Sequence, residues 1–323
     1  MPARDAGAEA GQVTSGRFDT RVLEPSGPER RDDPFLAPDP VAAGVRGALA
    51  ILSPLGTGDL TWESLCEDAP HLLPWCRARW LAGLGPLTPA PTSLPATVAS
   101  LHQVAQHVLA PWRYRAQGRI GLRWTLGGFG TPFARGDRQA RVVDGILVRQ
   151  AGDVAEGTVP ATLGGAAEWL GGPLGAPAEL YKPDRAADPS EPLDLSADAA
   201  AWVGEWFGFS TRVLEEVRVG EPDYGRRRVQ LWPEHFDLSV ELGAGRAAGT
   251  FGASPGDADH DGPYLYVTEG EKGCLSTSEW RDPAFRGVSL PLGDLLAASQ
   301  QLDAAVAFFE HHRMLLERSA GHR

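Results

Sequence analysis

The chain has 323 residues, of which 42% are hydrophobic and 22% charged, and its formal net charge at pH 7 is −12. This composition is typical of a soluble globular protein that is long enough to bury a sizeable core. A charge this negative argues against nucleic acid and anionic membrane surfaces as partners, because both attract positively charged surfaces. The longest apolar run, near residues 47–55, is too short to span a membrane.

The cysteines and the N-terminus indicate a cytoplasmic protein. Cys66, Cys76 and Cys274 show no CxxC spacing and are too few for a disulfide framework. The first residues lack the charged and then apolar pattern of a signal peptide. We therefore expect the protein to be cytoplasmic.

The N-terminal third of the sequence is predicted to contain a tail followed by helices. Residues 1–40 are rich in Gly, Pro and charged residues and carry few large apolar side chains, so we expect a disordered tail. Residues 41–117 are predicted to form a helical N-terminal segment. It contains short helices at 59–65 and 72–81 and a long helix at 93–115, where apolar residues repeat at helical spacing.

Residues 118–323 are predicted to form an α+β domain with an antiparallel sheet. Two regions, 119–150 and 226–268, alternate between apolar and polar residues, which is typical of half-buried strands. Asp144-Gly145 has the composition of a tight hairpin turn. The pattern is compatible with one sheet or with two.

Helices are predicted to cover this sheet. The first runs from the capping residue Ser196 to Phe207, is ended by Gly208 and continues as a second short helix to residue 217. The last starts near Pro291, a residue that favours the first turn of a helix, and extends to about residue 317. The fold class that we predict is therefore an antiparallel sheet covered by helices, with a helical N-terminal segment.

The stretch from residue 229 to residue 268 holds the densest group of chemically useful side chains. Strand alternation over 236–242 places Phe236 and Leu238 on one face, and His235 and Asp237 on the other. Alternate residues on one strand face are about 7 Å apart, so His235 and Asp237 could converge on one ligand, metal or water. The alternative is a solvated strand face that has no site.

Further candidates surround these two residues. Asp257 and His260 belong to a loop that should return towards the start of the strand, which predicts a single cluster of His235, Asp237 and Asp257. The same three residues are the candidate metal ligands, and His260 joins them as a catalytic candidate. The candidate ligand-binding residues supply aromatic walls and a carboxylate: Trp232, Glu234, Tyr264 and Tyr266.

Two loops resemble known ion-binding patterns only in part. Residues 257–262 match the first half of a calcium-binding loop, but Thr268 stands where a bidentate Glu is needed, so an acidic turn is the favoured alternative. The glycine-rich loop 127–132 lacks the Lys-Ser/Thr ending of a phosphate-binding loop. We expect a corner of the sheet there.

Four short sequence motifs resemble those of a known protein family. Leu-Trp-Pro-Glu-His-Phe-Asp-Leu at 231–238, Ala-Ser-Pro-Gly-Asp at 253–257, Pro-Tyr-Leu-Tyr-Val at 263–267 and Gly-Gly-Phe-Gly-Thr-Pro at 127–132 resemble a protein family of high-GC bacteria that shares a domain of unknown function. The resemblance spans about residues 120–310. It implies no particular activity, but it groups Trp232, His235, Asp237 and Asp257.

Three functional hypotheses follow, and none implies a particular cofactor. The first is a small-molecule binding or regulatory module that uses the Trp/His/Asp cluster. The second is a metal-assisted or acid–base hydrolase with His235 as general base or metal ligand, Asp237 as its orienting group, and Asp257 with His260 opposite them. The third is a structural or interaction protein. The sequence has no nucleophile elbow, zincin helix, P-loop or dinucleotide-binding fingerprint, which favours the first hypothesis.

Overall fold

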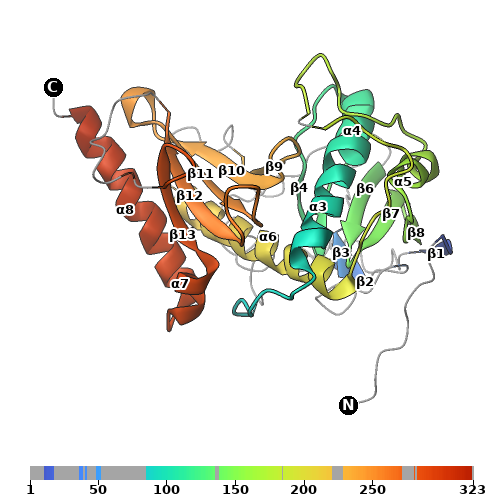
Figure 1. Ribbon diagram of the computed structural model, residues 1–323, viewed down its shortest axis with the longest axis horizontal. Coiled ribbons are helices and arrows are strands. Elements are labelled where there is room, and N and C mark those ends of the chain that lie inside the picture. Colours follow the sequence, from blue (N-terminus) through green and yellow to red (C-terminus); the bar gives the residue numbers. More distant parts are fainter. Residues whose placement is uncertain are drawn as a thin grey trace, which may run out of the picture.

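Two large antiparallel sheets, a two-stranded pair and the helices packed on the large sheets make up the described fold, which confirms the predicted α+β class (Figure 1). The computed structural model describes residues 11–17, 36–38, 41, 49–51, 85–134, 138–183, 185–219, 228–270, 280 and 282–321. The predicted helices at 59–65 and 72–81 lie outside the described residues, as do all three cysteines.

The first sheet is built around the hairpin that the sequence predicts at Asp144-Gly145. Across the sheet its strands are β1 (Thr14–Arg17), β8 (Val154–Thr158), β7 (Ile146–Ala151), β6 (Arg138–Val143), β5 (Gly128–Gly130) and β4 (Arg123–Thr125). Asp144 and Gly145 have φ angles of 48° and 83°, the positive values that this type of tight turn needs at both positions. The hairpin is therefore confirmed, and the glycine-rich loop forms β5.

Strand β1 corrects part of the prediction that residues 1–40 form a disordered tail. It pairs antiparallel with β8, with Thr14 opposite Gly157. Arg17 forms an ion pair with Asp153 at 2.8 Å, and alternate residues of the strand are exposed. Backbone pairing holds this edge strand with little apolar burial, so an argument from apolar content cannot detect it.

Within the predicted helical segment 41–117, the long helix expected at 93–115 is confirmed. There α3 (Leu94–Val104), the π-helical turn η4 (Ala105–Leu109) and α4 (Ala110–Gln117) follow one another. In the same predicted segment, β3 (Leu49–Ile51) is a strand, paired antiparallel with β2 (Leu36–Pro38). Residues 52–84 lie outside the described part of the chain.

The π-helical turn has a local cause and makes His107 a buried anchor. Pro111 has no N–H, so it cannot bond the carbonyl of His107 one turn earlier in the helix. That carbonyl instead accepts the N–H of Gly175 at 3.0 Å. His107 Nδ1 accepts the N–H of Ala176 at 3.1 Å, which attaches the connection after α5 (Leu163–Leu170) to the helix.

The second sheet contains the predicted strand at 236–242 and four others. Its order is β13 (Gly287–Pro291), β12 (Tyr264–Glu269), β11 (Gly249–Ser254), β10 (Asp237–Leu242) and β9 (Gln230–Trp232). All neighbours are antiparallel. Strands β9 and β13 are the edges of the sheet.

The two sheets are separate but meet at one backbone bridge. The amide of Leu122 donates to the carbonyl of Leu231 at 2.7 Å, and the amide of Leu231 donates back at 2.9 Å. The bridge brings the edge strands β4 and β9 together. The predicted regions 119–150 and 226–268 therefore form two sheets joined edge to edge.

Helix α6 (Ala197–Arg218) contacts both sheets and lies at the centre of the fold (Figure 1). Trp206 and Phe207 are completely buried. The prediction that Gly208 ends this helix is wrong, because the helix continues through it and buries Gly208. A Cβ atom at Gly204 would lie 2.5 Å from the carbonyl carbon of Gly127, so the absence of a side chain permits the close approach to the first sheet.

The C-terminal helices flank the second sheet (Figure 1). The helix predicted at 291–317 is divided into α7 (Leu292–Ala297) and α8 (Gln301–Gly321), because Ala298 adopts an extended conformation. Phe309 of α8 packs against Phe251 of β11 with ring centroids 5.8 Å apart. Within the described residues, no helix combines the length and the apolar character needed to cross a bilayer.

Candidate functional site

The second sheet has an apolar face and a polar face. Leu238 and Val240 of β10 belong to the buried core with α6 and α8. The polar face holds a pocket of about 640 Å³. Five residues proposed from the sequence line this pocket: Trp232, Glu234, His235, Asp237 and Tyr266. The strand alternation thus predicted correctly which side chains of β10 turn away from the core.

Asp237 is the most buried carboxyl group of the pocket. It is 6% exposed, and its Oδ2 accepts a hydrogen bond from the hydroxyl of Tyr266. Its Oδ1 is buried and has no hydrogen-bond partner among the described residues. Burial raises the pKa of Asp237 to about 6, against the opposing effects of the Tyr266 hydrogen bond and of His235, and the charge of Glu234 raises it further. Half of this carboxyl group is thus left unsatisfied.

Tyr266 reaches Asp237 because a glycine lies between them. In the strand register, Gly252 of β11 is opposite both Tyr266 of β12 and Ser239 of β10. A Cβ atom at Gly252 would lie 2.3 Å from Cζ of Tyr266. The tyrosine ring therefore lies across the glycine, and its hydroxyl bonds to a carboxyl group two strands away.

His235 does not share a strand face with Asp237, which corrects the predicted alternation. Strand β10 begins at Asp237, and residues 233–236 form a turn in which the amide of Phe236 donates to the carbonyl of Trp232 at 2.7 Å. His235 is exposed at the pocket edge. Glu234, in the same turn, has a buried Oε2 that lacks a hydrogen-bond partner among the described residues.

Phe236 holds this turn in an unusual conformation. Its φ angle is 54°, which costs a residue with a bulky side chain on the order of 1–3 kcal/mol. Its ring is 1% exposed and packs against Phe129, Phe207 and His102, with centroid distances of 5.1, 5.3 and 5.5 Å. The packed aromatic core offsets the strain and fixes Glu234 and His235 relative to the strand.

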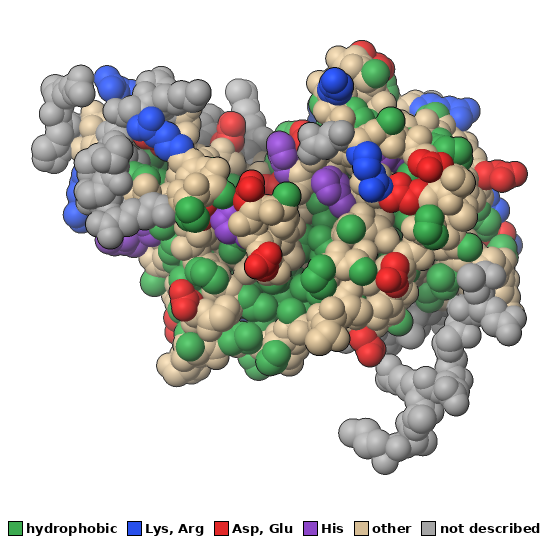
Figure 2. All heavy atoms as spheres, viewed as in Figure 1, with side chains coloured by type: hydrophobic (Ala, Val, Ile, Leu, Met, Phe, Trp, Pro, Cys, Tyr) green, Lys and Arg blue, Asp and Glu red, His purple; other side chains and the backbone are tan. Residues whose placement is uncertain are grey.

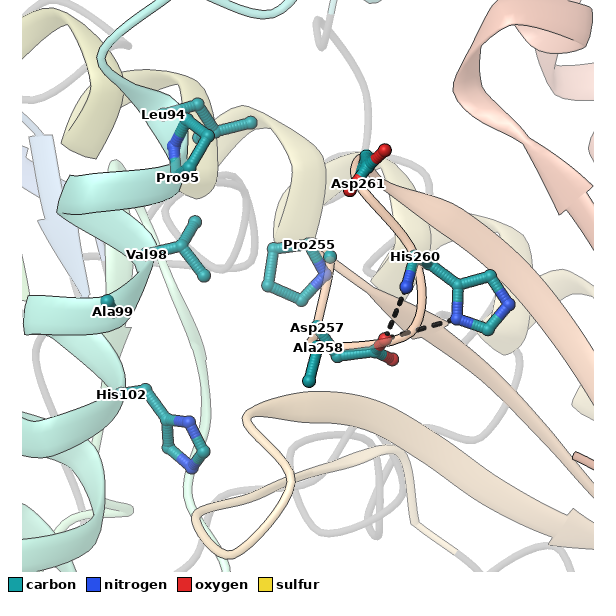
Figure 3. Close-up of a pocket in the computed structure, with 11 residues that line it drawn as sticks. Leu94, Pro95, Val98, Ala99, His102, Pro255, Asp257, Ala258, His260 and Asp261 are labelled. Atoms are coloured by element: carbon teal, nitrogen blue, oxygen red, sulfur yellow. Dashed lines mark hydrogen bonds and ion pairs between the residues drawn. The ribbon is translucent and has the colours of Figure 1, made fainter. Parts of the chain in front are cut away.

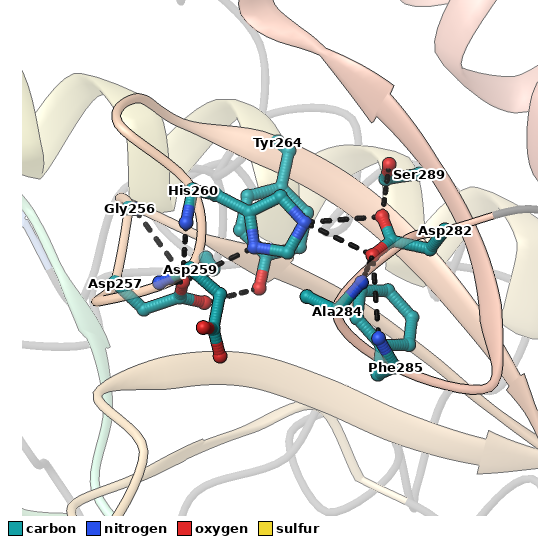
Figure 4. A network of polar contacts seen from close by, with 10 residues as sticks. Gly256, Asp257, Asp259, His260, Tyr264, Asp282, Ala284, Phe285 and Ser289 are labelled. Atoms are coloured by element: carbon teal, nitrogen blue, oxygen red, sulfur yellow. Dashed lines mark hydrogen bonds and ion pairs between the residues drawn. The ribbon is translucent and has the colours of Figure 1, made fainter.

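A second polar network on the same sheet is centred on His260 (Figure 4). His260 Nδ1 lies 3.1 Å from Asp257 Oδ1, and Nε2 lies 3.0 Å from Asp282 Oδ2. Burial alone would lower the pKa of His260, but the hydrogen bonds to Asp282 and Asp257 raise it above its usual value. Tyr264 donates to Asp257 at 2.5 Å, and Ser289 donates to Asp282 at 2.5 Å. The imidazole ring is thus held between two carboxylates, which favour its protonated form.

Residues 257–262, which match the first half of a calcium-binding loop, form an acidic turn. Asp257 Oδ1 accepts the backbone amides of Asp259 and His260, both at 2.9 Å, which is the local bonding of an acidic turn. No group of three or more His, Cys, Asp or Glu side chains among the described residues is arranged to hold a metal ion. The proposed metal ligands His235, Asp237 and Asp257 therefore do not form a metal site within this part of the chain.

The predicted single cluster of His235, Asp237 and Asp257 is divided between the two networks. Asp237 bonds to Tyr266, whereas Asp257 bonds to Tyr264. The two tyrosines are alternate residues of β12, and their ring centroids are 6.0 Å apart. The aspartates are therefore connected through a pair of aromatic rings and do not share a hydrogen bond.

A second cleft of about 570 Å³ lies between α3 and the loop that contains Asp257 (Figure 3). Val98 and Pro255 face each other across it, and His102 lies at one end. In the space-filling view, hydrophobic and histidine side chains gather in the middle of this face (Figure 2). Burial lowers the pKa of His102, and its Nε2 lies 3.0 Å from the carbonyl oxygen of Pro233. This histidine therefore supports the turn beside the first pocket.

Three residues that build these networks were not predicted from the sequence. Asp282 and Ser289 complete the His260 network, and Gly252 admits the Tyr266 ring. The alternation of Val288, Ser289 and Leu290 was a readable strand signal. The pairing of Asp282 with His260 was not readable, because it joins residues on different loops.

Comparisons of the chain with protein-family models, with curated proteins and with solved structures find no significant match. The resemblance to the family of high-GC bacteria therefore stays a prediction. The geometry of the two networks is the basis for assigning a function.

Proposed function

We propose that the protein is a small-molecule binding module whose site is the pocket on the polar face of β9–β12. The observation that carries this proposal is the unused Oδ1 of Asp237. A buried polar atom without a partner costs about 1–3 kcal/mol, and native proteins satisfy most such atoms. A ligand that donates a hydrogen bond to Oδ1 would recover this cost on binding.

The pocket has the dimensions and rigidity of a ligand site. Its volume of about 640 Å³ is within the range of small-molecule pockets. Its walls come from hydrogen-bonded strands and from the turn that Phe236 holds in place. Trp232 and Tyr266 supply aromatic surface, and Asp237 supplies an orienting polar group. This combination supports binding without a large rearrangement of the protein.

The same geometry gives less support to the hydrolase hypothesis. A general base must be free to accept a proton. Both ring nitrogens of His260 lie within hydrogen-bond distance of carboxylate oxygens, which raise its pKa and favour a ring that donates on both sides instead of accepting a proton. Asp237, the proposed orienting group of His235, instead bonds to Tyr266 through Oδ2, and its Oδ1 has no partner among the described residues, so the proposed pair of base and orienting group is not formed. Ser289 donates to Asp282 instead of to a histidine, so no nucleophile is paired with a base there.

A thermal-shift screen tests the proposal. The wild-type protein is heated with a panel of small cationic, neutral and anionic metabolites, in parallel with Trp232→Ala and with Val98→Ala, which alters only the second cleft. A ligand at one hundred times its Kd should stabilise the wild type by about 2.7 kcal/mol. We expect Trp232→Ala to lose this stabilisation and Val98→Ala to keep it. A panel in which no compound stabilises the wild type, or stabilisation that survives Trp232→Ala, contradicts the proposal.

A further inference from the structure

We infer that the ligand of this pocket is a small organic cation, an amine or a guanidinium compound, bound by Asp237 and Glu234. This inference rests on the proposed binding function and names its ligand class. Two buried carboxylate oxygens, Asp237 Oδ1 and Glu234 Oε2, lack hydrogen-bond partners among the described residues. Both residues line the same pocket. A ligand that satisfies these two acceptors must supply hydrogen-bond donors.

The chemistry of the two acceptors favours a positively charged donor. An ionised carboxylate only accepts hydrogen bonds, whereas an ammonium or guanidinium group only donates them. Charge-assisted hydrogen bonds are about twice as strong as neutral ones. An anionic ligand would add a third negative charge beside Asp237 and Glu234, and a neutral ligand would leave their charges uncompensated.

The electrostatics of the pocket point in the same direction. Burial first, and then the charge of Glu234, disfavour the ionised form of Asp237 and raise its pKa to about 6. A cation between the two carboxylates would reverse both effects and lower this pKa. Glu241 also lines the pocket, and the guanidinium of Arg228 is the one Arg or Lys group among the described lining residues. The chain as a whole carries a net charge of −12, which attracts cations from solution.

The aromatic residues of the pocket suit the same class of ligand. Trp232 is half-buried, and Tyr266 lies across Gly252 on the pocket face. Indole and phenol faces attract cations by about 0.5–2 kcal/mol when the cation is partly desolvated. No described group of His, Cys, Asp and Glu side chains has the arrangement of a metal site, which favours an organic cation over a metal ion.

The closing experiment uses three probes that share one skeleton and differ in charge. Phenethylamine is cationic, 2-phenylethanol is neutral and 3-phenylpropionate is anionic at neutral pH. Binding to the full chain is measured by isothermal titration calorimetry. We expect the amine to bind at least about tenfold more tightly than the alcohol, which corresponds to about 1.4 kcal/mol, and the carboxylate not to bind. Asp237→Asn and Glu234→Gln should each remove this preference, while Asp261→Asn, an exposed carboxylate in the second cleft, should keep it.

The pH dependence provides a readout that a merely structural carboxylate would not produce. The amine stays charged throughout, but Asp237 ionises with a pKa of about 6. Affinity for the amine should therefore rise between about pH 5 and pH 8, and Asp237→Asn should abolish the rise.

The remaining outcomes contradict either the cation class of the ligand or the binding function. Tighter binding of the alcohol or the carboxylate, lost in Trp232→Ala, refutes the cation class but leaves the binding function intact. Stoichiometric binding of Mg²⁺ or Zn²⁺ without binding of the amine replaces the organic cation by a metal. The absence of binding by all three probes refutes the cation inference, and the wider metabolite panel then decides the binding function.

Discussion

Two carboxylate clusters occupy the polar side of the second sheet, and they are built in opposite ways. Around His260, every oxygen of Asp257 and Asp282 accepts at least one hydrogen bond. In the other cluster, Oδ1 of Asp237 has no hydrogen-bond partner among the described residues, and neither has Oε2 of the neighbouring Glu234. The clusters are linked by the rings of Tyr264 and Tyr266. Location therefore does not explain the difference. One network satisfies all of its carboxylate oxygens, whereas the other leaves two of them without partners in the described part of the chain, and this is the difference on which the proposed binding function rests.

The largest effect is expected from breaking the complete network. Asp282→Ala removes a fully buried carboxylate and leaves the His260 imidazolium with one anionic partner. Loss of one member of a buried pair costs roughly 3 kcal/mol or more. Denaturant unfolding should show this loss, whereas Asp259→Ala, at an exposed residue in the loop of His260, should change the unfolding free energy by less than about 0.5 kcal/mol. A small effect of Asp282→Ala would mean that the network does not hold the fold.

Gly252→Ala should damage the incomplete network selectively. The new methyl group would overlap the Tyr266 ring, separate its hydroxyl from Asp237 and cost about 1–3 kcal/mol. The matched control is Gly293→Ala in α7, where an added Cβ meets no atom within 4 Å. NMR titration of His260 should be unchanged in Gly252→Ala. A shifted His260 titration would show that the two clusters act as one.

A smaller effect is expected from pH. The folded-state pKa of His260 is raised, so its contribution to stability is complete below the unfolded pKa near 6.5 and is lost as pH rises through the folded value. The pKa values of Asp257 and Asp282 are lowered despite burial, because of the hydrogen bonds that they accept, so their contributions are lost as pH falls through their folded values. The difference in unfolding free energy between wild type and His260→Gln should therefore shrink towards alkaline pH. A constant difference would contradict the charged imidazole.

The sequence was sufficient to predict the polar face of strand β10 but not the details of the candidate site on it. The period of two over Leu238, Ser239 and Val240 revealed which side chains turn away from the core, because alternation follows directly from strand geometry. The positive φ of Phe236 was not readable, because it depends on the rings of Phe129 and Phe207 that pack around it. Tertiary packing therefore moved His235 out of the predicted strand.

Long-range pairing accounts for the other differences. The passage of the Tyr266 ring over Gly252 depends on the register of β11 with β12, which one sequence does not reveal. The same limit applies to β1, an edge strand that is held by its pairing with β8.

The stability of Asp237→Asn tests the central claim most directly. The folded-state pKa of Asp237 is about 6, against an ordinary value of 3.8, so stability should fall by up to about 3 kcal/mol as pH rises from about 4 to 7. In Asp237→Asn, the side-chain amide oxygen can still accept the hydrogen bond from Tyr266, but the buried negative charge is removed. If Asp237 serves ligand binding at the expense of stability, Asp237→Asn should raise the unfolding free energy by roughly 1–3 kcal/mol at about pH 8. The same variant should lose affinity for the ligand. A variant that is less stable than the wild type at that pH would contradict the account and make Asp237 part of a structural network.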